Sequence, residues 1–222
     1  MGVSGPALQM DLEQIDFWSN QNKMSINANK CEVIHTGNKN PGITYTLSGE
    51  IVANTNKIKD LGITVDDQLK FTSHFSIIQS KCLRLIGFIF KSLHSRNQSL
   101  YLTYFSTCIL PVVEYSSFIY VGISKKNDTI IEKIQRIFTR RLYRRMFNRK
   151  PVPVYNERLK LFSLEPITIH ILKINLVTLY KIKLRLIRTR SLNLRHGTLH
   201  TNSFLIPSIN SALYRNSFVI RH

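Results

Sequence analysis

The stretch NDTIIEKIQRIFTRRLYRRMFNRK, residues 127–150, predicts one helix with two unlike faces. Apolar side chains recur at three- and four-residue spacing, which aligns them along one side of a helix. These side chains are Ile131, Ile134, Phe138, Leu142 and Met146. We expect Asn127 or Asp128 to cap the start of this helix, because their side chains can accept from an orphan backbone N–H. Pro151 and Pro153 should end it.

The other sides of this helix carry basic residues, and no acid lies between Lys133 and Lys150. Solvated helix faces usually mix charges of both signs, because like charges four residues apart repel. The pattern therefore favours a polyanion partner over an amphipathic helix whose charges are merely solvated. The candidate phosphate-contacting residues are Lys133, Arg136, Arg140, Arg141, Arg144, Arg145 and Arg149.

Composition places the positive charge in the second part of the chain. The 222 residues are 43% hydrophobic, enough for a packed core, and carry a net charge of +18. Residues 1–67 hold 5 Lys/Arg and 8 Asp/Glu, a balance of −3, whereas residues 68–222 hold 26 and 5, a balance of +21. Such a field indicates nucleic acid or an anionic membrane surface as partner, and says nothing of fold.

Cysteine usage and hydropathy indicate where the protein works. The three cysteines match no disulfide or zinc spacing, and the N-terminus lacks a basic region followed by an apolar core. We therefore expect an intracellular protein, in nucleus or cytoplasm. Residues 100–123 are apolar enough to span a bilayer, but Pro111 and Glu114 lie near the middle. A buried helix pair broken at Pro111 is favoured, and no membrane partner is expected.

The order of predicted elements indicates an α+β fold, with a small strand-bearing part before a helical part. A short strand at 31–36, a hairpin of 43–47 and 51–54 around Ser48-Gly49, and a strand at 57–65 are expected. Helices are expected at 8–22, from Ser73 to about 93, from Asn97 to about 122, at 155–162 and at 166–190. The predicted parts of the chain are a strand-bearing segment at 1–70, a helical domain at 71–150, a connector with a long helix at 151–190 and an irregular tail at 191–222.

No residue pattern in the chain predicts a catalytic or metal site. Asp66 and Asp67 follow a strand, where adjacent side chains point to opposite faces, so a turn explains them better than an ion. His196 and His200 have helical metal spacing, but Gly197 lies between them and no acid or cysteine is near. Taken alone, these spacings predict a non-enzyme that binds polyanions.

Residues 18–75 carry a more specific resemblance. They contain WSNQNKMSINANKCEVIHTG and IKDLGITVDDQLKFTSHF, which resemble segments of the reverse transcriptases (RNA-directed DNA polymerases) of jockey-like non-long-terminal-repeat retrotransposons. The family run W-S-x-x-x-x-M-x-x-N-x-x-K-C-x-V-x-x-x-G is carried by Trp18, Ser19, Met24, Asn27, Lys30, Cys31, Val33 and Gly37. The family strand K-D-L-G-[VI] is carried by Lys59, Asp60, Leu61, Gly62 and Ile63.

The resemblance continues in family order to the end of the chain. Pro111, Glu114 and Tyr115 match the family helix with a central proline and a Glu-Tyr pair. IEKIQRIFTRRL resembles its L-E-x-[VI]-Q-R helix at Ile131, Glu132, Gln135 and Arg136. YNERLKLFSLEPI resembles its Y-x-x-R-L segment at Tyr155, Arg158, Leu159 and Leu164.

The resemblance implies the back part of a polymerase. Residues 57–65 would be the primer-grip hairpin, with primer contact at Asp60, Leu61 and Gly62. The helices from Ser73 to Arg149 would be a thumb that holds a template–primer duplex of RNA and DNA by its phosphates.

The same resemblance implies that this chain lacks the catalytic centre. The family binds Mg²⁺ through aspartates that include a Y/F-A-D-D turn, and no such turn occurs here. The prediction is thus a polymerase-inactive fragment with no cofactor of its own, which would need the N-terminal polymerase part as partner. Two alternatives stay open: a non-functional remnant of a mobile element, and a basic peripheral membrane protein.

Overall fold

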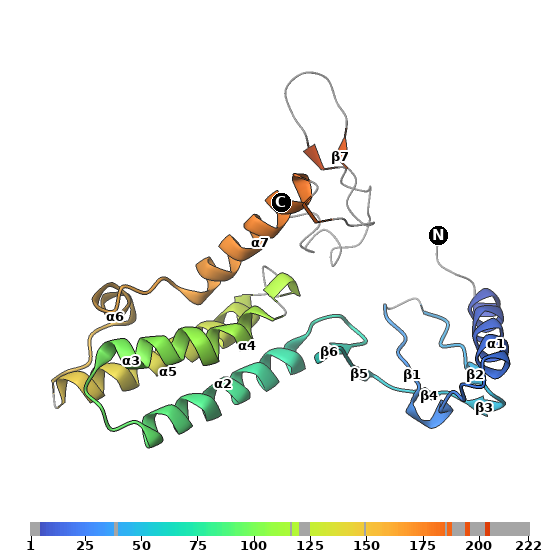
Figure 1. Cartoon of the computed structure of the whole chain (residues 1–222), viewed down its shortest axis with the longest axis horizontal. Helices are drawn as coiled ribbons and strands as arrows, with labels where there is room; N and C mark the ends of the chain where they lie inside the picture. The colour runs from blue at the N-terminus through green and yellow to red at the C-terminus, as the bar shows by residue number, and fades with distance from the viewer. Residues whose placement is uncertain are drawn as a thin grey trace. The chain divides into compact units, whose positions relative to one another are not determined.

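The computed structural model describes residues 5–37, 40–115, 117–119, 125–148, 150–184, 186–187, 194–195 and 203–204 (Figure 1). Helices dominate the described residues and the strands are short, so the fold is α+β, as predicted. The chain divides into two compact units, Met1–Phe71 and Thr72–His222.

The first unit packs one helix on short paired strands. Helix α1 (Gly5–Gln21) confirms the predicted helix, and a 3-10 turn η1 (Ala28–Lys30) follows. Strand β1 (Glu32–Val33) pairs in parallel with β4 (Ala53–Asn54). Gln9 of α1 bonds to the backbone of Thr46 in β2 (Thr46–Leu47), accepting from its N–H at 3.0 Å and donating to its carbonyl at 3.1 Å. These bonds attach the helix to the edge of the strand.

The predicted hairpin at Ser48-Gly49 is confirmed. Strand β2 pairs antiparallel with β3 (Glu50–Ile51), so the connecting loop has two residues. Ser48 and Gly49 have φ of 52° and 78°, the left-handed backbone at both central positions that a type I′ turn requires.

The prediction of one strand over residues 57–65 is wrong, because the chain turns back in its middle. Strand β5 (Lys57–Asp60) pairs antiparallel with β6 (Ile63–Asp66) across a turn at Leu61-Gly62, whose φ values are 44° and 84°. This hairpin is the shape that the family resemblance implied. Asp66 ends β6 in a turn, as predicted: its buried carboxylate accepts from the N–H groups of Lys70 at 2.8 Å and Phe71 at 2.7 Å.

The second unit is a helical bundle around an aromatic core. Helix α2 (Thr72–Ser92) packs beside α5 (Lys125–Phe147), and α3 (Gln98–Tyr104) packs on both (Figure 1). The Phe138 ring lies 4.4 Å from the Phe105 ring and 5.7 Å from the Phe90 ring, between centroids. The predicted apolar stripe of the basic helix is confirmed, since four of its members are fully buried: Ile131, Ile134, Phe138 and Leu142.

The predicted break at Pro111 takes the form of a π-helical segment. The helix predicted from Asn97 is α3, and Asn97 caps it, with its side chain accepting from the Ser99 N–H at 3.0 Å. The π-helical η2 (Phe105–Ile109) then leads into α4 (Leu110–Glu114). Pro111 has no N–H for the helical ladder, and a π-bulge accommodates such a gap without ending the helix. The predicted end near residue 122 is wrong, because α4 ends at Glu114 and a 3-10 turn η3 (Ser117–Ile119) follows.

The basic helix starts earlier than predicted. Because α5 begins at Lys125, Asn127 and Asp128 lie inside its first turn and do not cap it. It ends at Phe147, before Pro151. Helix α6 (Tyr155–Leu161) and helix α7 (Ile167–Lys183) follow, and the predicted extension to residue 190 is wrong, since α7 ends at Lys183. Two short strands, β7 (Leu194–Arg195) and β8 (Ser203–Phe204), pair antiparallel.

The described residues contain neither a candidate membrane span nor a candidate metal site. No described helix is long and apolar enough to cross a bilayer. No three described His, Cys, Asp or Glu side chains gather where they could hold a metal ion. The predicted pair His196 and His200 lies outside the described residues.

Candidate nucleic-acid interface

Helices α2 and α5 run in the same direction, so their C-terminal ends meet. Gln79 of α2 donates to the Ile130 carbonyl of α5 at 2.8 Å, and eleven residues further along α2 the Phe90 carbonyl accepts from Arg145 at 2.7 Å. A hollow of about 660 Å³ opens between the two ends, and we call it the basic groove. Gly87 and Phe90 form part of its wall, and its cationic or titratable side chains are Lys91, His94, Arg96, Arg141, Arg144 and Arg145.

The charge of the basic groove exceeds what the helix ends explain. Each helix C-terminus carries a partial charge of about −0.5, so two ends attract roughly one positive charge between them. The groove holds five Lys and Arg side chains and no acid. The groove therefore carries about four positive charges more than the two helix ends attract.

No carboxylate of the described residues neutralises the groove. Elsewhere in the described residues, Glu165 pairs with Lys173, and Glu114 and Glu165 each contact a ring nitrogen of His170. Those four side chains lie at a second hollow of about 500 Å³ or beside it. The Lys173 ammonium beside Glu165 lowers the pKa of that carboxyl below its usual range. The acids at the second hollow therefore have partners there, whereas no acid lines the basic groove.

Arg145 has a structural task as well as a place in the groove. Its guanidinium is half-buried and donates to the Phe90 carbonyl, one of the last four carbonyls of α2, which have no partner within the helix. Arg145 thus fastens the end of α2 to α5. Lys91, His94 and Arg96 come directly after this fastening, so it brings them opposite Arg141 and Arg144.

Three further predicted phosphate contacts, Lys133, Arg136 and Arg140 of α5, do not line the groove. Lys133 and Arg140 are exposed. The Arg136 guanidinium lies 4.1 Å from the centre of the Tyr155 ring, a cation–π contact that holds it against α6. Arg149 lies outside the described residues. Of the six predicted residues that the structure describes, it brings Arg141, Arg144 and Arg145 together in the groove.

A buried polar network holds the bundle around α5. Arg158 of α6 is 4% exposed, and its guanidinium donates to Thr139 Oγ1 at 3.2 Å and to the Pro153 carbonyl at 2.6 Å. The Tyr155 hydroxyl donates to Glu132 and lies 2.7 Å from Gln135 Oε1. Burial, and then the neighbouring Glu132 carboxylate, raise the pKa of Tyr155, while burial lowers the pKa of Arg158.

The same network begins α7. Gln135 accepts from the Ile167 N–H at 3.1 Å, and Glu132 accepts from the Thr168 N–H at 3.3 Å. Both are orphan donors of the first turn of a helix. Glu132, Gln135, Tyr155 and Arg158 are among the residues on which the family resemblance depends. These bonds give each of the four side chains a structural role, which does not depend on any activity.

The sequence analysis did not predict Lys91, His94 and Arg96, which are three of the six cationic or titratable side chains of the groove. A signal was present, because KSLHSR at residues 91–96 places two cations and a histidine at the predicted end of a helix. Only the parallel packing of α2 on α5 brings them to the basic helix.

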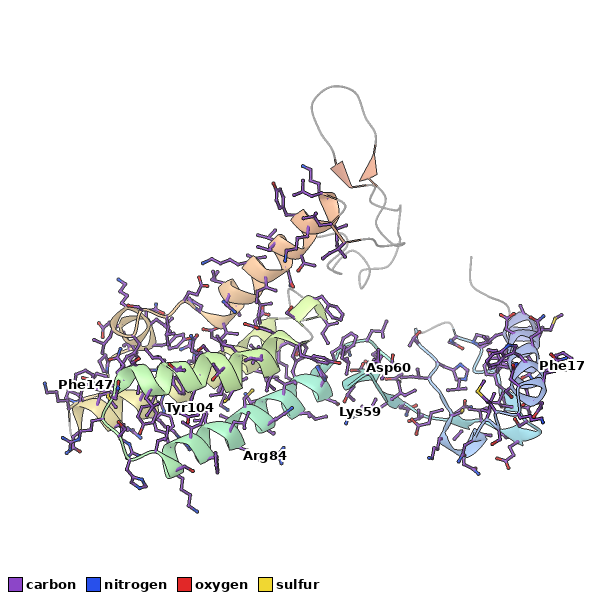
Figure 2. All side chains as sticks on the ribbon, viewed as in Figure 1. Phe17, Lys59, Asp60, Arg84, Tyr104 and Phe147 are labelled. Atoms are coloured by element: carbon purple, nitrogen blue, oxygen red, sulfur yellow. The ribbon has the colours of Figure 1, made fainter. Side chains whose placement is uncertain are left out.

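The predicted primer-grip residues lie in the first unit. Asp60 ends β5, and Leu61 and Gly62 form the turn of the hairpin. Leu61 is 81% exposed. Figure 2 labels Lys59 and Asp60, the last two residues of β5.

Comparison with known proteins gives similarity but no activity. The chain is 27% identical over 90 residues to the uncharacterized protein B0403.1 of Caenorhabditis elegans. The match covers 40% of this chain and 46% of that protein, so it spans less than half of that relative's length. No protein-family model and no solved structure matches the chain. A functional assignment therefore depends on the geometry of the site and on the family resemblance.

Proposed function

We propose that this chain binds nucleic-acid duplexes through their phosphates, with the basic groove as the centre of the contact. The observation that carries this is the surplus of positive charge at the ends of α2 and α5, where five cations meet and no acid lines the groove. Duplex phosphates supply the dense negative charge that such a site would neutralise, with release of counterions.

The proposed contact is not sequence-specific. Lysine and arginine side chains that reach phosphates fix the position of a duplex without distinguishing its bases. The groove walls offer the Phe90 ring, but this ring is packed 4.9 Å from the Tyr101 ring in the core and is not free to stack on a base. We therefore expect DNA duplexes and RNA–DNA hybrids of any sequence to bind.

The family resemblance narrows this proposal to a template–primer duplex. In this proposal, helices α2 to α5 correspond to the thumb of a retrotransposon reverse transcriptase. The β5–β6 hairpin corresponds to its primer grip, with contact at Asp60, Leu61 and Gly62. We assign no catalytic step and no Mg²⁺ ligand to this chain. The proposed place of action is inside the cell, where such duplexes occur.

The test is a comparison of two variants that lose the same charge. The groove variant carries Lys91→Ala, Arg96→Ala, Arg141→Ala and Arg144→Ala, and keeps Arg145 so that the end of α2 stays attached. The control variant carries Lys23→Ala, Lys30→Ala, Lys81→Ala and Lys160→Ala, all exposed and none lining the groove.

Binding of a fluorescent duplex is measured by anisotropy near 0.1 M salt. We expect the groove variant to lose about 30-fold or more in affinity and the control variant to lose only a few-fold, since close phosphate contacts contribute more than distant charges. Equal losses in the two variants would mean that only net charge matters, and the groove would then have no special role.

A further inference from the structure

Helix α7 has a broad apolar face that no other described residues cover. Its sequence, ITIHILKINLVTLYKIK, is apolar on nearly all sides, a composition typical of a helix that is covered all round. Only Ile167, Ile171 and Asn175, spaced four residues apart, are buried against the bundle. The polar member of this row is satisfied, since Asn175 exchanges hydrogen bonds of 3.2 Å with Ser117 of η3.

The uncovered apolar side chains lie on one side of the helix, with Lys173 between Ile169 and Leu176. Ile169, Leu176, Tyr180 and Leu184 follow one another at spacings of seven, four and four, which places them on one side. Leu176 is 43% exposed, Tyr180 60% and Leu184 50%, and Val177 beside them is 52% exposed. Soluble proteins seldom expose apolar side chains in such a row unless the row contacts a partner.

The exposed charges beside Leu176, Tyr180 and Leu184 are positive. Lys181 and Lys183 are exposed, while Lys173 is paired with Glu165. From residue 166 to the last residue the sequence contains 3 Lys, 6 Arg and no Asp or Glu, a balance of +9. A partner of this face should therefore combine an apolar layer with negative charge.

We propose that the outer face of α7 docks on an anionic lipid surface. Aliphatic side chains would enter the boundary between head groups and acyl chains, Tyr180 would place its ring there with the hydroxyl toward water, and the two lysines would meet acidic head groups. This departs from the expectation of no membrane partner. It does not depend on the proposed duplex binding, because Lys181, Lys183 and the apolar face lie outside the basic groove.

Other occupants fit this face less well. A nucleic acid offers charge but no apolar layer for four aliphatic and aromatic side chains. A second copy of the chain would offer an apolar face, but would add its own Lys181 and Lys183 to the interface, and an excess of like charge in an interface is costly. Charge complementarity therefore favours lipid.

The test uses the full chain with vesicles of phosphatidylcholine, with or without phosphatidylserine, and measures the fraction that floats with them. The apolar variant carries Leu176→Gln, Val177→Gln, Tyr180→Ser and Leu184→Gln. The charge variant carries Lys181→Gln and Lys183→Gln. The control variant carries Ile77→Gln and Phe88→Gln, which removes exposed apolar side chains from α2.

We expect the natural chain to float with vesicles that contain phosphatidylserine, and more weakly with the neutral ones. The apolar variant should lose at least about tenfold in partition coefficient, and the charge variant about fivefold per lysine on acidic vesicles alone. The control variant should bind as the natural chain does. Circular dichroism checks that each variant keeps its helices.

Three results would overturn the proposal. The natural chain could fail to float with acidic vesicles, or the apolar variant could float as well as the natural chain. In the third, the natural chain would not float but would run as a dimer in gel filtration, and the apolar variant would run as a monomer. The outer face of α7 would then be a contact between two copies of the chain. If the groove variant lost flotation and the apolar variant did not, the proposal would also fail, because binding would then depend on the net charge of the chain and not on the apolar face of α7.

Discussion

Tyr155 is the residue at which α5, α6 and the start of α7 are held together. Its hydroxyl donates to Glu132 and lies beside Gln135. The side chains of Glu132 and Gln135 in turn accept from the first N–H groups of α7. Its ring carries the guanidinium of Arg136 on one face. A buried network of this kind is stabilising only while every member keeps its partner.

Tyr155→Phe removes one donor from this network and leaves the ring in place. We expect a loss of about 1–3 kcal/mol in the free energy of unfolding, because the Glu132 carboxylate is then left short of a buried partner. Urea denaturation followed by circular dichroism measures it. Tyr180→Phe is the matched control, since Tyr180 is exposed and should cost nearly nothing. Equal effects in both variants would show that the network contributes little.

The raised pKa of Tyr155 gives this variant a pH signature. Below about pH 10 the phenol is protonated in the folded and unfolded chains alike, so it adds no pH dependence. Above that pH the unfolded chain loses the proton while the folded chain keeps it, so stability falls as pH rises. The decline from pH 9 to pH 11 should be shallower in Tyr155→Phe than in the natural chain, and identical slopes would contradict the assignment.

At the scale of elements, the apolar spacing of the sequence was sufficient to predict α1, α2 and the buried face of α5. Turn positions were harder. KIKDLGITV alternates through both arms of the β5–β6 hairpin, so its period-two pattern does not show that Leu61 and Gly62 reverse the chain. The start of α5 was also misplaced, because Asn127 is a good capping residue and also a tolerated first-turn residue, and spacing does not distinguish the two.

The candidate site could be predicted only in part, because it arises from packing between helices. The cations of α5 were visible in one stretch of sequence, but Arg136 is held on Tyr155 and Arg145 on the Phe90 carbonyl. Lys91 and Arg96 join the groove only because α2 and α5 are parallel. That direction depends on tertiary contacts that no local pattern contains.

Arg145 provides the element-scale prediction. Arg145→Gln should lower the free energy of unfolding by about 1.5–3 kcal/mol, because a charged donor to the end of α2 is lost from a half-buried position. Arg140→Gln removes the same charge from an exposed position of the same helix and should change stability by less than about 0.5 kcal/mol. Thermal unfolding of the two variants side by side measures the difference. If Arg140→Gln were the more harmful, the helix-end role of Arg145 would be wrong.

The whole molecule consists of two units of different charge and composition. Unit 1–71 contains the single tryptophan, Trp18, on α1, where it and Phe17 are exposed (Figure 2). Unit 72–222 contains most of the helix and the aromatic core. Tryptophan fluorescence therefore reports the first unit, and circular dichroism near 222 nm reports mainly the second.

Unfolding in urea should give two transitions that do not coincide. We expect the fluorescence midpoint of Trp18 to come first, because its unit has short strands and a helix with exposed apolar residues, while the helical signal is lost later in one cooperative step. Coincident curves would show that the units unfold together. A sloping helical signal without any transition would favour the alternative of a non-functional remnant that does not pack.

The salt dependence of duplex binding tests the central claim most directly. The logarithm of the association constant is measured against the logarithm of salt concentration for the natural chain and for the variant lacking Lys91, Arg96, Arg141 and Arg144. Each lost phosphate contact should reduce the steepness of the line by about 0.9, so four contacts reduce it by roughly 3 to 4. A natural chain with a slope near zero, or a groove variant with an unchanged slope, would contradict binding through the basic groove.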